Sequence, residues 1–311
     1  MMLLSAGTNI NFPNLGIELK DVGSSIHIFG ISIAFYGMVI ALGMVMGYLV
    51  AEWQAKRTGQ NPDLYLDFAL YAIVLSVIGA RVYYVVFNWK EYQNSPLEIF
   101  DIRNGGLAIY GGVITAVLTA FIYSKIKKIS FGLLADTGCL GLITGQIIGR
   151  WGNFFNREAF GEYSNGLFAM QLNIKDVSSD YTMSLANLAQ KFAGKEQAYN
   201  KILEIRNHTV DIAGATYIQV QPTFLYESGC NLVLLILLIF YSKHKKFNGE
   251  VILLYLLGYG LVRVWVEGYR TDQLFLFDSP IAVSQLLSGI LVVASLAIII
   301  FKRYQIKKKT A

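Results

Sequence analysis

Long runs of apolar residues alternate with short polar segments along most of the chain. Each run has about 20 residues, the length at which an α-helix crosses a hydrocarbon core of roughly 30 Å. The pattern therefore predicts an all-α integral membrane protein with seven transmembrane helices. The runs lie near residues 29–51, 66–88, 106–124, 130–149, 221–242, 250–268 and 280–301.

Basic residues follow every second run, beginning with Lys56 and Arg57 after the first. Cytoplasmic loops retain lysine and arginine more than exported loops do. We therefore expect the N-terminus outside the cell and the C-terminus in the cytoplasm. Residues 302–311 would form a basic cytoplasmic tail that suits an anionic leaflet. The first residues lack the basic n-region of a cleaved signal peptide, so none is expected.

One polar segment, residues 152–220, is much longer than the others and falls on the predicted outer side. Residues 183–212 within it have apolar positions at helical spacing. We expect a small extracytoplasmic head domain with one or two amphipathic helices. The chain then divides into residues 1–151 with helices 1–4, the head, and residues 221–301 with helices 5–7. The basic residues of the head are interpreted as a solvated face: Lys191, Lys195, Lys201 and Arg206.

The composition supports a membrane protein, because 54% of the residues are hydrophobic and only 15% are charged. A soluble domain has about 25% charged residues. The net charge of +5 comes largely from the basic clusters on the predicted inner side, so no nucleic-acid partner is needed to explain it. The two cysteines, Cys139 and Cys230, lie inside predicted helices and form no disulfide or metal-binding pattern.

Arginines lie at the outer ends of three predicted helices, at Arg81, Arg150 and Arg263, and Arg270 follows just beyond the sixth. An intramembrane charge costs roughly 2.5 to 3.5 kcal/mol on insertion scales, so such residues need a partner or a function. Guanidinium groups carry paired donors that match the oxygens of a phosphate. We therefore predict a phosphate-binding site at the level of the outer headgroups.

The residues Arg263, Glu267 and Arg270 are spaced i, i+4, i+7 and share one helix face, with Tyr259 one turn earlier. This face can be part of a ligand site. It can equally be a set of side chains that form ion pairs within their own helix while reaching toward the interface. The sequence leaves both interpretations open.

The stretch GRWGNFFNREAFG, residues 149–161, places several polar groups at the end of the fourth run. We expect Gly149, Gly152 and Gly161 to loosen the helix and to free backbone donors near Asn153. Non-helical backbone at membrane depth occurs where it lines protein or a water-filled cavity. The side chains that would then face such a cavity are Arg150, Asn153, Asn156 and Glu158. Alternatively, they cap the helix and lead into the head domain.

Two further stretches fit the same outer cavity. NGGLAIYGG, residues 104–112, places glycines around Tyr110 at the start of the third run, and QPTFLYES, residues 221–228, carries Glu227 into the fifth. Each is weak evidence alone, because glycines also serve helix packing and an interfacial tyrosine often belongs to the aromatic belt. Tyr36 and Asp136 are similarly ambiguous.

These stretches together resemble the prolipoprotein diacylglyceryl transferase family. GRWGNFFNREAFG is similar to the family signature, in which Gly-Arg, Gly-Asn, Asn, Glu and Gly recur at this spacing. Five other stretches are similar to family segments and occur in the family's order: FYGMVIALG, GARVYYVVFNW, NGGLAIYGGV, QPTFLYE and RVWVEGYRTDQ. The resemblance covers residues 29–300 except the head.

The resemblance implies a multi-pass enzyme of the bacterial cytoplasmic (inner) membrane. Such an enzyme transfers the diacylglyceryl group of phosphatidylglycerol to the lipobox cysteine thiol of a preprolipoprotein and releases glycerol phosphate. This is the first step of lipoprotein maturation, and it needs no cofactor or metal. The implied partners are phosphatidylglycerol, signal peptides with a lipobox cysteine, and membrane lipid.

The resemblance also assigns roles to residues. Arg150 and Arg263 match the essential arginines of the family. Other positions that match functionally important ones are Asn153, Glu158, Gly161, Glu227, Glu267, Arg270, Tyr36, Tyr259, Gly105 and Asp136. Two positions depart from the family, because Tyr110 stands in place of a histidine and Gln221 in place of the histidine that commonly precedes Pro-Thr.

The chemistry requires a thiol of pKa about 8.5 to lose its proton near neutral pH. We expect Arg150 and Arg263 to stabilise the leaving phosphate. The base stays open between Glu158 and Glu267, with Tyr110 as a donor or orienting group. No histidine is expected to be required, because none matches a family position: His27, His208 and His244. The alternative class is a phospholipid-binding or carrier membrane protein with an arginine-lined headgroup site, although no internal repeat supports a carrier.

Overall fold

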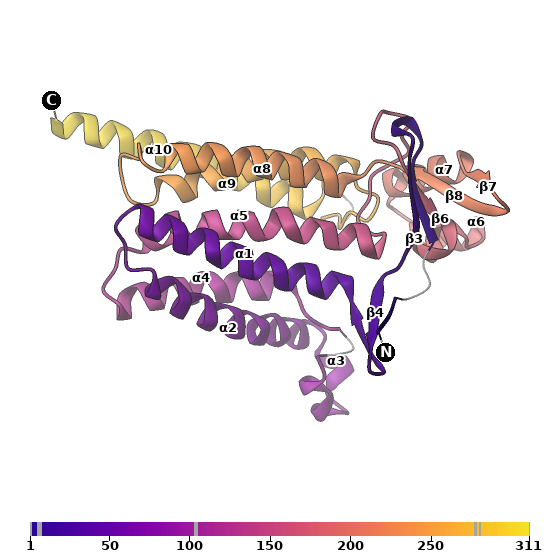
Figure 1. Cartoon of the computed structure of the whole chain (residues 1–311), viewed down its shortest axis with the longest axis horizontal. Coiled ribbons are helices and arrows are strands. Elements are labelled where there is room, and N and C mark those ends of the chain that lie inside the picture. The colour runs from indigo at the N-terminus through magenta and orange to yellow at the C-terminus, as the bar shows by residue number, and fades with distance from the viewer. Residues whose placement is uncertain (1, 5–7, 103–104, 277–278, 280, 311) are drawn as a thin grey trace. The chain divides into compact units, whose positions relative to one another are not determined.

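The fold is mostly helical in a computed structural model that describes residues 2–4, 8–102, 105–276, 279 and 281–310. Within these residues, seven helices are long and apolar enough to cross a membrane, which confirms the predicted number. They are α1 (Phe35–Arg57), α2 (Asp63–Phe87), α4 (Ile109–Ile126), α5 (Phe131–Asn156), α8 (Thr223–Tyr241), α9 (Glu250–Tyr269) and α10 (Val283–Thr310), drawn in Figure 1. The last helix continues through the basic residues of the tail.

The expectation of an all-α fold is wrong, because two antiparallel sheets accompany the helices. One has the strand order β1-β4-β5, and the other has the order β3-β2-β6-β8-β7. The strands are β1 (Met2–Leu4), β2 (Thr8–Phe12), β3 (Ile17–Val22), β4 (Ser25–Ile28), β5 (Ile31–Ala34), β6 (Met170–Asn173), β7 (Val210–Ile212) and β8 (Ala215–Val220). The short helices are α3 (Trp89–Tyr92), α6 (Leu185–Lys191), α7 (Glu196–Asn207), η1 (Pro13–Leu15), η2 (Pro96–Phe100), η3 (Ile174–Asp176) and η4 (Ser179–Tyr181).

The chain forms two compact units. The first contains Met1–Gly47, Leu142–Phe240 and Leu253–Ala311, and the second contains Tyr48–Gly141 and Tyr241–Ile252. The first unit therefore holds both sheets, the head helices α6 and α7, and most of α8, α9 and α10.

The first apolar run does not begin a helix at residue 29. Residues 25–34 form the β4–β5 hairpin, in which Ser25 pairs with Ala34 and Ile28 with Ile31. Alternating β-branched residues favour strands. Phe29 and Gly30 both have positive φ, as a two-residue hairpin turn of type I′ requires. The helix α1 starts only at Phe35.

The glycines of GRWGNFFNREAFG do not loosen the fourth span, contrary to expectation. Helix α5 continues through Gly149 and Gly152 to Asn156. A Cβ added at Gly152 would lie 2.8 Å from the ring of Tyr36, and one at Gly149 would lie 3.3 Å from the Ile40 side chain. These glycines therefore allow α1 to approach α5 closely, as small residues do between membrane helices.

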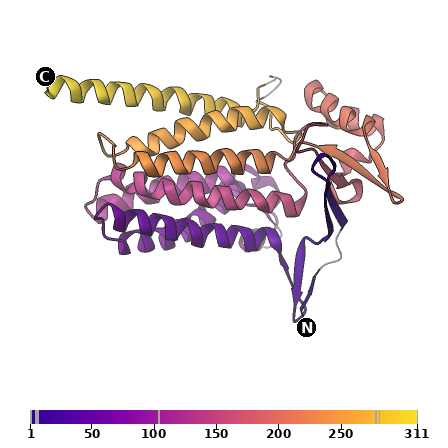
Figure 2. The same cartoon turned by 45° about the horizontal axis from the view of Figure 1, so that its top comes forward.

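Close approach also joins the other helices of the first unit. A Cβ at Gly43 of α1 would lie 3.1 Å from the carbonyl oxygen of Gly145 on α5. A Cβ at Gly260 of α9 would lie 3.1 Å from the carbonyl oxygen of Ser288 on α10. The Ser228 hydroxyl of α8 donates to the Ile147 carbonyl of α5 at 2.9 Å. Figure 2 shows α8, α9 and α10, in orange to yellow, running along one another.

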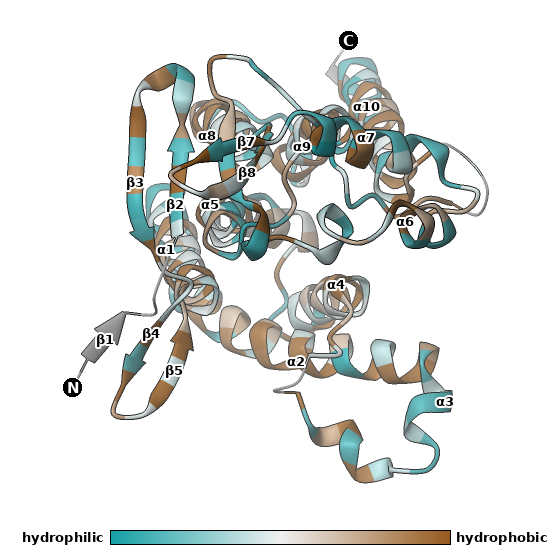
Figure 3. Ribbon diagram, turned by 90° about the vertical axis from the view of Figure 1, so that its right-hand side faces the viewer, coloured by the Kyte–Doolittle hydropathy of each residue, from teal (hydrophilic) through white to brown (hydrophobic). Residues whose placement is uncertain are grey.

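The head has a core of its own between the second sheet and its two helices. Strands β2, β6 and β8 supply buried residues such as Ile10, Leu172 and Ile218, and α7 supplies Ile202 and Ile205. The prediction of one or two helices in this segment is confirmed by α6 and α7, and Figure 3 shows hydrophilic and hydrophobic residues mixed along α7. The β2–β3 hairpin joins the sheet through β2 and β6, a long-range pairing that helical periodicity does not indicate.

In the second unit, the side chain of Arg81 forms hydrogen bonds with backbone carbonyls. Its guanidinium donates to the carbonyls of Glu98, Ile99, Gly105 and Gly106 at 2.6 to 3.1 Å. The expectation that Arg81 offers its donors to a phosphate is therefore wrong. A Cβ at Gly106 would collide with this guanidinium, so the glycine is required where α2 holds the segment that leads to α4.

Asp136 also has a structural environment in the second unit. Its buried carboxylate accepts from Lys245 Nζ at 2.8 Å and from the backbone N–H groups of Gly249 at 2.9 Å and Ile252 at 3.0 Å. The last two donors lie at the N-terminal end of α9, where unpaired N–H groups favour an anion. These contacts account for the carboxylate without a ligand.

Asp136→Asn should lower the free energy of unfolding by about 2 to 4 kcal/mol, because it removes the charge from a buried, hydrogen-bonded pair. Unfolding of the purified protein in mixed micelles measures the change. Asp67→Asn is the matched control, because Asp67 pairs with Lys127 at 3.1 Å with both side chains more than a third exposed. The control should cost less than about 1 kcal/mol. Equal stability of the two variants would contradict this account.

Candidate active site

A single buried carboxylate, Glu227 near the start of α8, joins three helices. Its Oε1 lies 2.6 Å from Nη2 of Arg150 on α5 and accepts from the Tyr259 hydroxyl of α9 at 3.3 Å. Its Oε2 accepts from Nη1 of Arg263 on α9 at 3.2 Å. Glu227 is only 1% exposed, so its charge depends on these partners. The structure thus brings together both arginines that the sequence singled out.

The network continues along α9 toward the head. Arg263 Nη2 lies 2.6 Å from Glu267 Oε2, and Arg270 Nε lies 3.9 Å from the same oxygen. Arg263 and Glu267 pair within α9, as the spacing predicts, and Arg270 pairs with Glu267 from just past the end of the helix. Because Arg263 also bonds Glu227, the face belongs to a larger cluster.

Arg270 lies just beyond α9 and forms a bidentate pair with Asp272, at 2.9 and 2.7 Å. Burial alone would lower the pKa of the Arg270 guanidinium, but the hydrogen bond and charge of Asp272 and the charge of Glu267 outweigh burial and raise it. Burial alone would raise the pKa of Asp272, and the Arg270 partner lowers it instead. Both groups therefore stay charged in the folded protein at neutral pH.

At the other end, the network reaches the surface through GRWGNFFNREAFG. Arg150 Nη1 donates to Asn153 Oδ1 at 3.4 Å. Glu158 Oε1 accepts from the amides of Asn153 at 3.0 Å and Asn156 at 3.2 Å. Glu158 is exposed, whereas Glu227 and Glu267 are buried. Of these three carboxylates, Glu158 is therefore the one that can accept a proton at the surface.

The arginines of this network do not form a bare cationic patch. Arg150, Arg263 and Arg270 contribute three positive charges, and Glu227, Glu267 and Asp272 contribute three negative charges. A guanidinium has five N–H donors, so one held by two carboxylates still has donors for a further anion. The carboxylates thus fix the orientation of the guanidinium groups.

The head core fixes the helix ends that carry the network. Phe154, one turn after Arg150, and Phe224, one turn before Glu227, both belong to that core, with ring centroids 5.3 Å apart. Gly161 lies where the chain enters the head, and its N–H donates to the Gln221 carbonyl at 2.9 Å. A Cβ there would lie 2.9 Å from Gln221 Cβ, so only glycine fits this crossing.

Arg157, to which the sequence assigned no role, anchors the same region. Its guanidinium lies 3.2 Å from Asp176 and donates to the backbone carbonyls of Val22 and Phe155. Burial lowers the pKa of Arg157, and the Asp176 charge opposes that effect. In the sequence, Arg157 is one of several polar residues in the stretch, and no local pattern distinguishes a structural arginine from one in the site.

The remaining predicted site residues lie in different places. Tyr36 contacts Gly152 in the first unit, on the helix that carries Arg150. Tyr110, half-buried in the first turn of α4, and Gly105, with φ of +94°, belong to the second unit with Asp136. Residue 104, the first of the stretch around Tyr110, lies outside the described residues.

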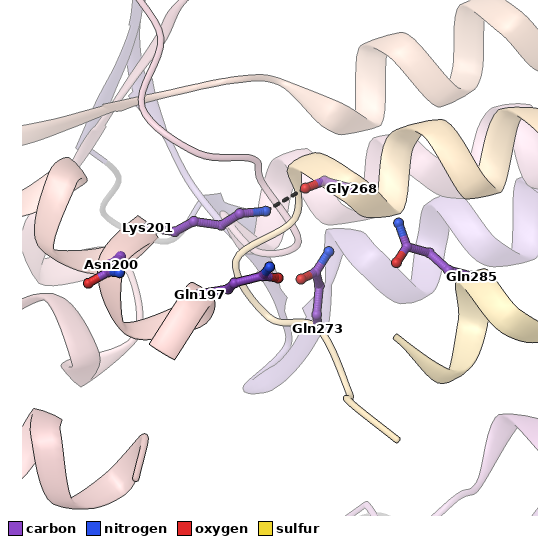
Figure 4. A pocket seen from close by; sticks show the side chains of 6 residues that line it. All are labelled: Gln197, Asn200, Lys201, Gly268, Gln273 and Gln285. Atoms are coloured by element: carbon purple, nitrogen blue, oxygen red, sulfur yellow. Dashed lines mark hydrogen bonds between the residues drawn. The ribbon is translucent and has the colours of Figure 1, made fainter. Parts of the chain in front are cut away.

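A polar cavity of about 370 Å³ adjoins the network on the head side. Figure 4 shows its lining residues, which are Gln197, Asn200, Lys201, Gly268, Gln273 and Gln285. The prediction that Lys201 belongs to a solvated face is wrong, because its ammonium donates to the Gly268 and Arg270 carbonyls. Gln273 donates to the Glu267 carbonyl. Apolar periodicity in α7 gives no sign that a lysine on the polar face binds the end of α9.

Within the described part of the chain, no group of three or more histidine, cysteine, aspartate or glutamate side chains is arranged to hold a metal ion. His208 stacks on Tyr163 in the head, with ring centroids 4.0 Å apart, and its Nδ1 lies 2.8 Å from the Glu204 carbonyl. His27 lies in strand β4.

The fold and the site define a multi-span membrane protein in which arginines and carboxylates of three helices form one network next to a small head. The sequence profile of the prolipoprotein diacylglyceryl transferase family matches residues 24–301. The chain belongs to this family.

Three relatives named phosphatidylglycerol–prolipoprotein diacylglyceryl transferase show the extent of the similarity. The protein of Finegoldia magna is 37% identical over 282 residues, which cover 90% of this chain and 96% of the relative. That of Listeria monocytogenes is 40% identical over 279 residues, covering 90% and 89%. That of Clostridioides difficile is 37% identical over 269 residues, covering 86% and 90%. The resemblance seen in the sequence is confirmed over nearly the whole chain.

Glu227→Ala should lower the free energy of unfolding by about 3 to 5 kcal/mol, because it leaves two largely buried guanidiniums without their shared carboxylate. Unfolding in mixed micelles measures this change. Glu162→Ala is the control, since Glu162 pairs with Lys201 at a longer 3.6 Å and is about a third exposed. A Glu227→Ala protein as stable as the control would show that the network does not hold the three helices.

Proposed function

We propose that this chain is a phosphatidylglycerol–prolipoprotein diacylglyceryl transferase, as its relatives are named. The observation that carries the proposal is the convergence of Arg150 and Arg263 on Glu227. Two guanidinium groups held in fixed orientation at the end of a helix bundle suit a lipid phosphate, because each offers further paired donors.

The reaction exchanges one bond at a glycerol carbon. The thiolate of the lipobox cysteine attacks the carbon that bears the phosphate ester, the S–C bond forms and the C–O bond breaks. The glycerol phosphate leaves with the electron pair of that bond, while the thiol proton passes to a base. Arg150 and Arg263 stabilise the charge on the departing phosphate. Holding lipid and peptide in one site adds the advantage of proximity.

Glu158 is our choice for the base. It is exposed, and its Oε1 is oriented by the amides of Asn153 and Asn156. Glu267 is less suited to accept a proton, because it is buried against Arg263. We assign Glu267 to holding that arginine, and Tyr110 to donating a hydrogen bond to substrate.

The remaining predicted residues would shape the binding site. Tyr259 and Glu227 orient the arginines, Asn153 contacts Arg150, and Arg270 extends the cationic side. Tyr36 packs against Gly152 on the helix that carries Arg150. Gly161 provides close backbone approach at Gln221, and Gly105 supplies a backbone conformation with positive φ. Asp136 supports α9 from its other end.

The membrane arrangement belongs to the same proposal. The substrates implied by the relatives' names are phosphatidylglycerol and a prolipoprotein. We place the protein in the bacterial cytoplasmic membrane, with residues 152–220 as an extracytoplasmic head, the N-terminus outside and residues 302–311 inside. The basic residues after alternate spans support this orientation.

Arg150→Lys and Arg263→Lys should each lower kcat about 10²- to 10³-fold, because a lysine keeps the charge but not the paired donors. The assay mixes purified protein, phosphatidylglycerol and a lipobox peptide, and mass spectrometry detects the diacylglyceryl group on the thiol. Arg206→Lys, in the head, is the control that should keep full activity. No mass gain with the unaltered protein would reject the transferase, and would favour a lipid-binding protein that uses the same arginines only for recognition.

Replacing His27, His208 and His244 together by alanine should leave kcat within a few-fold of the unaltered enzyme, because Tyr110 occupies the position of the family histidine. The same mass assay measures this, with circular dichroism to verify that the variant folds. Loss of activity in a folded variant would show that a histidine is needed after all.

A further inference from the structure

The polar cavity next to the network has an unusual lining. Of the six described residues that line it, four are carboxamides, and none of the six is a carboxylate or an aromatic residue. Gln197 and Asn200 come from α7, Gln273 from the segment after α9, and Gln285 from α10 (Figure 4). The cavity thus lies between the head and the ends of two long helices.

Lys201, the one cationic group among the described lining residues, already has partners. Lys201 Nζ donates to the Gly268 carbonyl, lies 3.3 Å from the Arg270 carbonyl and 3.6 Å from Glu162. A phosphate therefore finds its donors in the neighbouring arginine network, and the cavity presents a neutral polar surface. This neutrality selects an uncharged, hydrogen-bonding ligand.

The carboxamides divide into two pairs. Gln285 donates to the Val264 carbonyl at 3.2 Å and accepts from the Ala282 N–H at 3.4 Å, and Gln273 donates to the Glu267 carbonyl. These two hold the helix ends. The exposed Gln197 and Asn200 have side-chain amides that take no partner among the residues the structure describes. Each offers one acceptor and two donors, which match the C=O and N–H groups of a peptide main chain.

We propose that this cavity is a docking subsite for the extended main chain of the prolipoprotein substrate beside its lipobox cysteine. The inference rests on the proposed transferase function, which requires a peptide to be held close to a lipid phosphate. Gly268 follows Glu267 directly, and Gln273 is bonded to the Glu267 carbonyl, so the cavity wall is continuous with the network that contains Arg263. Main-chain recognition by amides accepts varied side chains, as a substrate set with one shared cysteine demands.

The first test measures binding without catalysis. The probe is a fluorescent lipobox peptide whose cysteine is replaced by serine, and the full-length protein is held in nanodiscs that contain phosphatidylglycerol. The double variant Gln197→Ala, Asn200→Ala should raise the peptide Kd about tenfold, as expected for the loss of two hydrogen bonds. The matched control is Asn187→Ala, Gln190→Ala on helix α6, which removes the same two residue types from an exposed head surface and should leave the Kd unchanged.

The second test identifies the peptide group that is recognised. Peptides that each carry one N-methylated main-chain nitrogen near the serine should bind the unaltered protein several-fold more weakly at one or two positions. The same methylations should have no effect on binding to the Gln197→Ala, Asn200→Ala protein. Additive losses would show that the cavity does not contact the main chain and would overturn the proposal.

Steady-state kinetics of the same variants separate the two substrates. The expected result is a raised KM for the reactive peptide with an unchanged KM for phosphatidylglycerol and an unchanged kcat. A raised KM for the lipid alone would assign the cavity to the lipid headgroup and overturn the proposal. If the unaltered protein binds the serine peptide through Gln197 and Asn200 but transfers no lipid, the transferase function fails while the docking subsite stands.

Discussion

The shared ion pair of Glu227 with Arg150 and Arg263 is the constraint on which the rest of the site depends. A buried carboxylate is costly unless cations and hydrogen bonds compensate it. Within the network, Glu227 is the one carboxylate that pairs with Arg150 and Arg263 from a different helix. α5, α8 and α9 must therefore meet at one level. The head sustains this meeting, because Phe154 and Phe224 fix the head-side ends of α5 and α8 in its core. Glycines also fix α5, because Gly152 leaves room for the ring of Tyr36 on α1.

Charge balance within the network changes how anion binding should be understood. An arginine whose only counter-ion is the ligand would reorient when the ligand leaves. Here carboxylates hold Arg263 from two sides and Asp272 holds Arg270 through two hydrogen bonds. The guanidinium groups are thus oriented before a phosphate arrives, and preorganised donors stabilise a developing charge without reorganisation during the reaction. The cost of this arrangement is a smaller net attraction for the anion.

The sequence predicts the parts of this molecule whose signal is local. Apolar runs predict seven spans, and the i, i+4, i+7 spacing of Arg263, Glu267 and Arg270 predicts neighbours that do pair, although Arg270 lies just past the end of α9. What it missed depends on residues far apart in the chain. The β2–β3 hairpin pairs with β6 across some 160 positions, as Asn11 with Gln171 shows. Arg81 looked equivalent to Arg150, but its donors go to four carbonyls of a loop that no periodicity describes. Gly149 and Gly152 are expected from the sequence to loosen the helix, but in α5 they serve contact with α1.

The choice of base follows from the different exposure of the carboxylates, because Glu227 and Glu267 are buried and Glu158 is exposed. The buried carboxylates Glu227 and Glu267 already pair with arginines. Protonating either would release a guanidinium that, in the proposed mechanism, stabilises the leaving phosphate. Glu158 lies at the exposed end, and its hydrogen-bond donors among the described side chains are the neutral amides of Asn153 and Asn156. A proton on Glu158 leaves every arginine pair intact. In the proposed mechanism, the same stretch supplies an arginine for the leaving group and a carboxylate for the thiol proton. With Glu158 in that role, a tyrosine at position 110 is compatible with the reaction, because the position then requires a donor and no base.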